Sequence, residues 1–198
     1  MQKIFDTIID SYLENNVGIA NHFLNAALAS RLRENLVSLY AGGQLRSAGI
    51  GNSIIPSQNS SVRSDMIYWL DRSHNDPGEN LFFDLMDDFI RYLNSSCYTG
   101  ISGYEFHYTM YETGSFYKRH LDQFRNNESR KYSMIMYLNT DWIQADGGEL
   151  CIHHADESFQ TITPLNGKSV FFKSNELEHE VLQANKARMS ITGWLKVD

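Results

Sequence analysis

The sequence is poor in three features, and each shortage excludes a class of protein. Only two cysteines, Cys97 and Cys151, occur among 198 residues, which excludes a disulfide scaffold and favours a reducing cytoplasm. No apolar run approaches the roughly 20 residues that cross a bilayer, and acidic residues interrupt the apolar N-terminal segment, so we expect neither a membrane span nor a signal peptide. Basic residues number 17 against 24 acidic residues, and the resulting net charge of -7 disfavours nucleic acid as a partner.

The remaining composition is that of an ordinary folded domain. Hydrophobic residues make up 42% of the chain and charged residues 21%, which argues against disorder, and the length suits a single domain. Apolar residues at helical spacing predict helices over about 4–13, 26–40 and 79–94. The second helix has Asn25 as a candidate N-cap. The segment 41–61 is rich in Gly, Ser, Asn and Gln, and it is predicted to be an exposed, mobile and functional loop.

From about Tyr104 onward the pattern changes to short segments rich in β-branched and aromatic residues, separated by turn residues. Short strands at near-regular spacing are typical of an antiparallel β-sandwich or barrel. We therefore expect a mainly β fold in which helices pack outside a small barrel. The predicted strands lie within 103–112, 115–122, 130–139, 147–154, 158–164, 168–173, 178–183 and 188–197.

The first candidate site comprises His120, Asp122 and His179, called the triad below. Residues i and i+2 of a strand point to the same face, so His120 and Asp122 would share one wall of the barrel. With His179 they would form the set of two histidines and one carboxylate that is diagnostic of non-haem Fe(II) oxygenases. A second His-x-Asp pair, His154 and Asp156, lies in a polar stretch that is better explained as a solvated loop.

The second candidate is Arg188, which shares one strand face with Ser190, Thr192 and Trp194. An arginine inside a barrel is costly unless it meets an anion, and a guanidinium binds a carboxylate through two hydrogen bonds. An inward-facing Arg188 therefore predicts an anionic ligand, to which Thr192 could donate a second hydrogen bond. The alternative is an outward-facing Arg188 that pairs with an acid such as Glu180.

Several motifs agree in order, spacing and residue type with one family. They are Tyr-Glu-Thr-Gly-Ser-Phe-Tyr-Lys-Arg-His-Leu-Asp at 111–122, Tyr-Leu-Asn at 137–139, Trp142, Gly-Gly-Glu-Leu at 147–150, His-Glu-Val at 179–181, Arg188 with Ile-Thr-Gly-Trp at 191–194, and Val-Arg-Ser-Asp-Met-Ile-Tyr-Trp-Leu at 62–70. On these residues the sequence is similar to the Fe(II)- and 2-oxoglutarate-dependent dioxygenases. It resembles their prolyl 4-hydroxylase branch, which includes the hypoxia-inducible-factor prolyl hydroxylases and their bacterial relatives.

The resemblance implies a role for each matching residue. The triad would bind Fe(II), with 2-oxoglutarate as cosubstrate, dioxygen as oxidant and ascorbate as a reductant. Arg188 and Thr192, together with Tyr137, would hold the distal carboxylate of 2-oxoglutarate, and Tyr111 would lie near it. The reaction would release succinate and carbon dioxide while a prolyl residue of a protein becomes hydroxylated at the 4-position.

The resemblance also implies how the chain is organised around its substrate. Residues 96–198 would form a double-stranded β-helix, or jelly-roll, barrel, and residues 1–95 would supply helical support and a lid. Within the lid, the loop 48–62 would close over a peptide that contains the target proline. We expect a cytoplasmic monomer in which Asp65 pairs with Arg130 at the pocket entrance. The residues expected to contact substrate are Arg63, Asp65, Arg130 and Trp194.

Two alternatives stay open at this stage. In the first, the same chemistry acts on a free amino acid, another side chain or a nucleobase, although the acidic balance counts against nucleic acid. In the second, the barrel binds a metal or 2-oxoglutarate as a sensor without turnover. The presence of the triad together with Arg188 argues against this second alternative.

Other conspicuous residues are predicted to have structural roles. Tyr108, Trp69 and Met110 could face the substrate, but core packing is favoured for each of them. Packing or surface positions are expected for His107 and His153, an inert buried thiol for Cys151, and a hairpin turn for Asp146-Gly147-Gly148.

Overall fold

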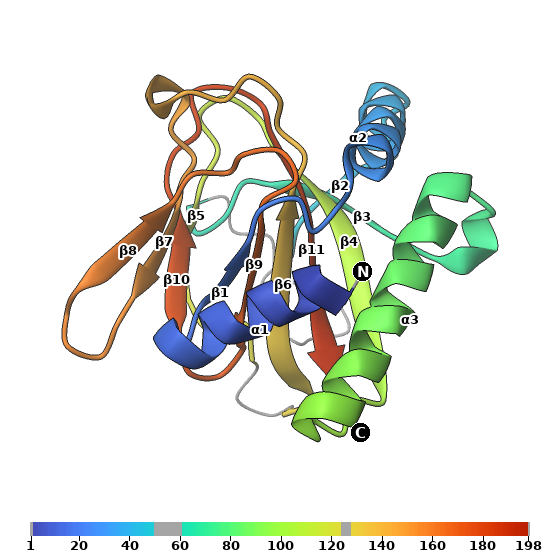
Figure 1. The fold of residues 1–198 in the computed structure, drawn as a ribbon. Coiled ribbons are helices and arrows are strands. Elements are labelled where there is room, and N and C mark those ends of the chain that lie inside the picture. The colour runs from blue at the N-terminus through green and yellow to red at the C-terminus, as the bar shows by residue number, and fades with distance from the viewer. Residues whose placement is uncertain (1, 50–60, 124–127, 198) are drawn as a thin grey trace.

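Two antiparallel sheets face each other in the computed structural model, which describes residues 2–49, 61–123 and 128–197 (Figure 1). The larger sheet has the strand order β1-β9-β6-β11-β4-β3-β2, and the smaller sheet has the order β5-β10-β7-β8. This arrangement confirms the predicted jelly-roll fold. The strands are β1 Gly18–Ala20, β2 Arg46–Ser47, β3 Met66–Trp69, β4 Gly103–Tyr111, β5 Tyr117–His120, β6 Arg130–Tyr137, β7 Leu150–His153, β8 Phe159–Ile162, β9 Ser169–Lys173, β10 Glu178–Val181 and β11 Arg188–Lys196.

Three helices confirm the predicted helical segments: α1 Gln2–Asn15, α2 Ala26–Ala41 and α3 Pro77–Cys97. Helix α2 begins after Asn25, whose side-chain oxygen accepts a hydrogen bond from the Leu28 amide at 2.9 Å. Helix α3 begins after Asp76 with Pro77 in its first turn, where a missing amide hydrogen costs nothing. Among the described residues, no helix is both long enough and apolar enough to span a bilayer.

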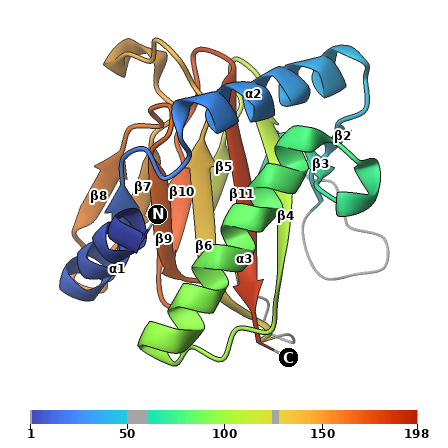
Figure 2. The ribbon, with the colours of Figure 1, turned by 45° about the vertical axis from the view of Figure 1, so that its right-hand side comes forward.

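The helices cover the outer face of the larger sheet and leave its inner face to the barrel (Figure 2). Strand β6 shows how one strand serves both layers, because successive side chains point to opposite faces. Met134 and Met136 pack beneath the helices, whereas Ile135 and Tyr137 lie in the barrel interior. The interior cluster comprises Val17, Tyr111, Ile135, Tyr137, Leu150, Ile152, Ile162, Val170, Phe172, Leu177 and Val181.

Some local predictions were wrong. The short strands β1, β2 and β3 were not predicted, because segments of two to four residues carry little periodicity. The segment 41–61 was predicted to be exposed, yet Leu45 and Ala48 are buried, while residues 50–60 lie outside the described residues. The predicted hairpin turn at 146–148 does not join paired strands, since β6 and β7 belong to different sheets.

Candidate active site

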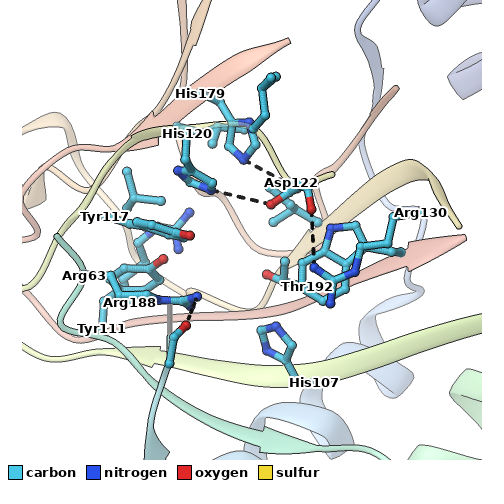
Figure 3. Close-up of a pocket in the computed structure, with 16 residues that line it drawn as sticks. Arg63, His107, Tyr111, Tyr117, His120, Asp122, Arg130, His179, Arg188 and Thr192 are labelled. Carbon is cyan, nitrogen blue, oxygen red and sulfur yellow. Dashed lines mark hydrogen bonds and ion pairs between the residues drawn. The ribbon is translucent and has the colours of Figure 1, made fainter. Parts of the chain in front are cut away.

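The triad predicted from the sequence comes together on the smaller sheet (Figure 3). Strands β5 and β10 pair in a register that sets His120 directly opposite His179, and Asp122 follows β5 by two residues. Each imidazole Nε2 lies 3.5 Å from an oxygen of Asp122, and the three donor atoms all lie within 4.8 Å of one another. The three side chains are therefore close enough to share a single ion.

The backbone sets the protonation of both imidazoles. The Nδ1 of His120 lies 2.7 Å from the carbonyl oxygen of Lys118, and the Nδ1 of His179 lies 3.1 Å from that of Leu177. A carbonyl can only accept, so each Nδ1 carries a hydrogen, and in the neutral tautomer that this allows the Nε2 lone pair points toward Asp122. Burial lowers the pKa of His179 to about 4, which keeps this imidazole neutral at physiological pH.

Asp122 is held as a carboxylate. Its burial alone would raise the pKa, but the neighbouring His179 and His120 and a hydrogen bond from Ser133 outweigh that effect and lower the pKa below its ordinary value. The Ser133 hydroxyl donates to Oδ2 at 2.7 Å and lies 2.9 Å from the hydroxyl of Ser174. Two neutral imidazoles and one carboxylate fit an Fe(II) ion that keeps open positions for other ligands.

Arg188 points into the barrel at the other end of the pocket. Its side chain is 1% exposed, and its Nε donates to the carbonyl oxygen of Gly148 at 2.8 Å. The guanidinium lies between two aromatic rings, 4.9 Å from the ring centre of Tyr111 and 5.1 Å from that of Tyr137. The alternative in which Arg188 faces outward and pairs with Glu180 is wrong, because Glu180 binds His153 at 2.9 Å.

Two buried donors at this end of the pocket have no hydrogen-bond partner within the described part of the chain, namely a terminal nitrogen of Arg188 and the hydroxyl of Tyr137. The indole nitrogen of Trp194, six residues further along β11, is likewise unpaired among the described residues. Burial raises the pKa of Tyr137, so its hydroxyl remains a donor. A buried cation without a counter-charge is costly, and a carboxylate would satisfy both the guanidinium and the phenol. The residues present therefore fit the distal carboxylate of 2-oxoglutarate.

Comparison with known proteins agrees with this donor set. The sequence profile of the 2OG-Fe(II) oxygenase superfamily matches residues 106–196. A solved structure of a Pseudomonas putida prolyl-4-hydroxylase is 31% identical with a TM-score of 0.88, and the alignment covers 98% of this chain and 99% of that one. The chain belongs to the 2OG-Fe(II) oxygenase superfamily.

Two further relatives of the oxygenase extend the likeness. Human Egl nine homolog 1 is 26% identical over 98% of this chain and 47% of its own length, so the chain spans about half of this curated relative. A Trichoplax adhaerens prolyl hydroxylase, solved with a peptide fragment of the hypoxia-inducible-factor oxygen degradation domain, is 22% identical with a TM-score of 0.86. That alignment covers 98% of this chain and 90% of the other, and it supports the shared fold.

The entrance of the oxygenase pocket is lined by two ion pairs that differ from the predicted one. Two nitrogens of the Arg63 guanidinium donate to the two carboxylate oxygens of Asp65, at 2.7 and 2.6 Å, and Asp65 is 1% exposed. Arg130 binds Glu105 at 2.7 Å and stacks 3.4 Å from the ring centre of Trp194. The predicted pairing of Asp65 with Arg130 is therefore wrong, although three of the four predicted substrate residues, Arg63, Arg130 and Trp194, line the pocket.

Several residues of the oxygenase pocket had no predicted functional role. Tyr117 stacks on His120 with ring centres 3.5 Å apart, and Arg63 covers its other face at 4.2 Å. His107 was predicted to pack or to lie on the surface, and it is buried, which agrees with packing. It also lines the pocket, and burial lowers its pKa to about 4. The spacing of residues in the sequence does not identify Tyr117 or His107 as pocket residues. Tyr117 lies within the motif at 111–122, but the motif does not indicate that its ring stacks on His120.

The predicted core aromatics divide into two groups. Tyr108 and Met110 are buried, as expected. Trp69 is 45% exposed, so its assignment to the core is wrong, and its ring meets His107 edge-on at 5.0 Å. Trp69 is the last residue of β3 and pairs with His107 of β4 on one side, whereas β2 pairs only with Met66 and Ile67 on the other.

Proposed function

We propose that the protein is a prolyl hydroxylase that acts on a protein or peptide substrate. The triad would hold Fe(II), and Arg188, Tyr137 and Thr192 would hold the distal carboxylate of 2-oxoglutarate. The observation that carries this proposal is the convergence in one pocket of three metal donors and a buried guanidinium that has no counter-charge among the residues the structure describes. Membership of the 2OG-Fe(II) oxygenase superfamily supports the same assignment.

When bound, iron and 2-oxoglutarate supply oxidative decarboxylation by dioxygen, giving succinate and carbon dioxide together with hydroxylation of a C–H bond. The protein contributes position and environment. The carbonyls of Lys118 and Leu177 keep the imidazole lone pairs directed at the ion, and Arg188 fixes the far end of the cosubstrate. The rings of Tyr111 and Tyr137 exclude water from the guanidinium and strengthen its attraction to a carboxylate.

A peptide is the favoured substrate because the pocket opens between side chains that can contact a chain running past it. Arg63 and Trp194 line the pocket wall, and Asp65 and Arg130 hold these two groups in place. The relatives named above support proline as the target, since two of them are prolyl hydroxylases. Hydroxylation at the 4-position is our specific proposal for the product.

The test is a turnover assay on the iron-loaded protein. The protein would be incubated with 2-oxoglutarate, ascorbate and a library of proline-containing peptides, and both succinate and peptide mass would be measured. We expect succinate release together with the mass of one oxygen atom on proline. Oxygen on another residue, or succinate without peptide oxidation, would assign a different substrate. Absence of turnover in every condition would favour a non-catalytic binding barrel.

The matched control is a pair of histidine variants. His179→Ala removes a triad member and is expected to abolish product, whereas His154→Ala changes a histidine of the β7–β8 turn and is expected to keep it. If the two variants behave in the opposite way, the metal ligands are assigned to the wrong His-x-Asp pair.

A further inference from the structure

A second group of metal-binding side chains lies on the outer face of the smaller sheet. Strand β10 carries His179 of the triad toward the barrel interior, and the next residue, Glu180, points to the opposite face. On the neighbouring strand β7, Ile152 faces the interior while Cys151 and His153 face outward. The outward residues are therefore separated from the triad by the sheet itself.

Strand pairing fixes the mutual positions of these three residues. Glu180 lies directly opposite Cys151 in the antiparallel pair, and His153 follows two residues along the same face. The Nε2 of His153 lies 2.9 Å from Oε1 of Glu180, and one donor atom from each residue lies within 4.8 Å of the other two. Cys151 is 5% exposed, whereas the side chains of His153 and Glu180 are 20% and 29% exposed. The cluster therefore lies on two paired strands, with its thiol buried and its imidazole and carboxylate partly open to solvent.

We propose that Cys151, His153 and Glu180 bind a second metal ion of the zinc class, with water as the fourth ligand. Ligand-to-metal distances of about 2.0–2.3 Å set neighbouring donors of a tetrahedral zinc site roughly 3.3–3.7 Å apart. In this cluster the His153 and Glu180 donors lie 2.9 Å apart, and all three donors lie within 4.8 Å of one another. Side-chain rotations on two fixed strands are enough to reach the required spacing.

Charge and donor softness distinguish this site from the triad. On binding, the Cys151 thiol releases its proton to solvent, so that one thiolate and one carboxylate neutralise the two positive charges of the ion. The triad offers only nitrogen and oxygen donors, whereas this cluster includes sulfur. Sulfur favours zinc and its spectroscopic substitute cobalt over magnesium or calcium. This second site is independent of the proposed hydroxylation.

A simpler explanation is a surface ion pair between His153 and Glu180 beside a bystander thiol. Measuring zinc bound per chain separates the two explanations. We expect the intact protein to bind two zinc ions in equilibrium dialysis, and we expect His179→Ala and Cys151→Ser each to bind one. His153→Ala, which alters a more exposed side chain, is expected to bind one even if Cys151→Ser fails to fold. His154→Ala is the matched control and is expected to bind two.

Cobalt supplies a readout that belongs to the sulfur site alone. Thiolate ligation produces intense near-ultraviolet charge-transfer absorption, which nitrogen and oxygen donors do not produce. This absorption is expected in the intact protein and in His179→Ala, and it is expected to be lost in His153→Ala and Cys151→Ser. Binding of one zinc ion by the intact protein would overturn the proposal, as would a cobalt–thiolate absorption that persists without Cys151.

Discussion

The two sheets of the barrel position their functional groups in different ways. The smaller sheet holds the histidines of the triad on strands of four residues, and each imidazole is oriented by the carbonyl two residues before it. The larger sheet holds Arg188 and Thr192 on the nine-residue strand β11, which pairs along its whole length with β4. Metal ligands are thus arranged by local backbone geometry, whereas the carboxylate site depends on burial by distant segments.

Because the two sites are built differently, a substitution at one end of the pocket should affect one ligand and leave the other in place. Loss of a metal ligand should remove the ion and leave the larger sheet intact. Loss of a group around Arg188 should weaken the binding of 2-oxoglutarate and leave the ion in place. Substitutions at the two ends of the pocket are therefore expected to separate iron affinity from 2-oxoglutarate affinity.

The largest effect is expected for His179→Ala. The triad has only three donors, so removal of one should lower iron affinity by more than the roughly 10- to 100-fold that loss of an outer hydrogen-bond partner costs. Iron binding measured by titration and succinate release should both fall to background, while circular dichroism stays unchanged. Retained iron affinity would show that a residue outside the triad completes the site.

A large and selective effect is expected for Arg188→Met, which removes the charge but keeps much of the side-chain volume. Loss of a charge-assisted hydrogen bond costs about 1.5–3 kcal/mol, which raises the KM for 2-oxoglutarate by about 10- to 150-fold. Iron affinity should not change. Arg188→Lys retains a charge but lacks the planar guanidinium, so its KM for 2-oxoglutarate should lie between those of the intact protein and Arg188→Met. If Arg188→Met lost affinity for both iron and 2-oxoglutarate, the two ends of the pocket would not be independent.

A moderate effect on the metal end is expected for Ser133→Ala. This change deletes the hydrogen bond to Asp122, and iron affinity should fall by about 10- to 100-fold. Ser169→Ala is the matched control, because Ser169 is equally buried and its hydroxyl has no partner among the described residues. Equal iron affinities for the two variants would show that Ser133 does not orient the carboxylate.

The smallest effect is expected for Gly148→Ala, at the residue whose carbonyl binds Arg188. Gly148 has a φ of 66°, and an added Cβ would lie 3.0 Å from the Arg188 side chain. The backbone conformation alone should cost about 1–3 kcal/mol of unfolding free energy, measured by thermal denaturation. Gly43→Ala is the control, since Gly43 has a φ of 65° and open space around it. Only Gly148→Ala should also raise the requirement for 2-oxoglutarate. If both variants required the same concentration of 2-oxoglutarate, Gly148 would not contribute to the carboxylate site.

The same contrast explains what the sequence could predict. Alternation along β11 correctly placed Arg188 and Thr192 on one strand face, and the His-x-Asp spacing correctly identified His120 and Asp122 as neighbours. These are local relations, so strand geometry is sufficient. The helices likewise follow from caps and apolar spacing within one segment. The inward direction of Arg188, which alternation left open, was favoured by the family resemblance and is confirmed by its burial.

Most of the contacts that were missed join different segments. Arg130 on β6 reaches Glu105 on β4 across the intervening strand β11, and the sequence alone does not specify that register. The Gly148 carbonyl is 40 residues from Arg188, so no spacing rule relates them. Ser133 reaches Asp122 only because β6 lies across the pocket from the end of β5. Long-range packing supplied these contacts.

The most direct test of the central assignment is to change both partners of the proposed carboxylate contact. Binding of 2-oxoglutarate and of 2-oxovalerate, which lacks the distal carboxylate, would be measured by anaerobic calorimetry on the iron-loaded protein. The intact protein should prefer 2-oxoglutarate by at least about tenfold, and Arg188→Met should bind the two compounds equally, because the lost contact involves only that carboxylate. An undiminished preference in Arg188→Met would contradict the assignment of Arg188 to the cosubstrate.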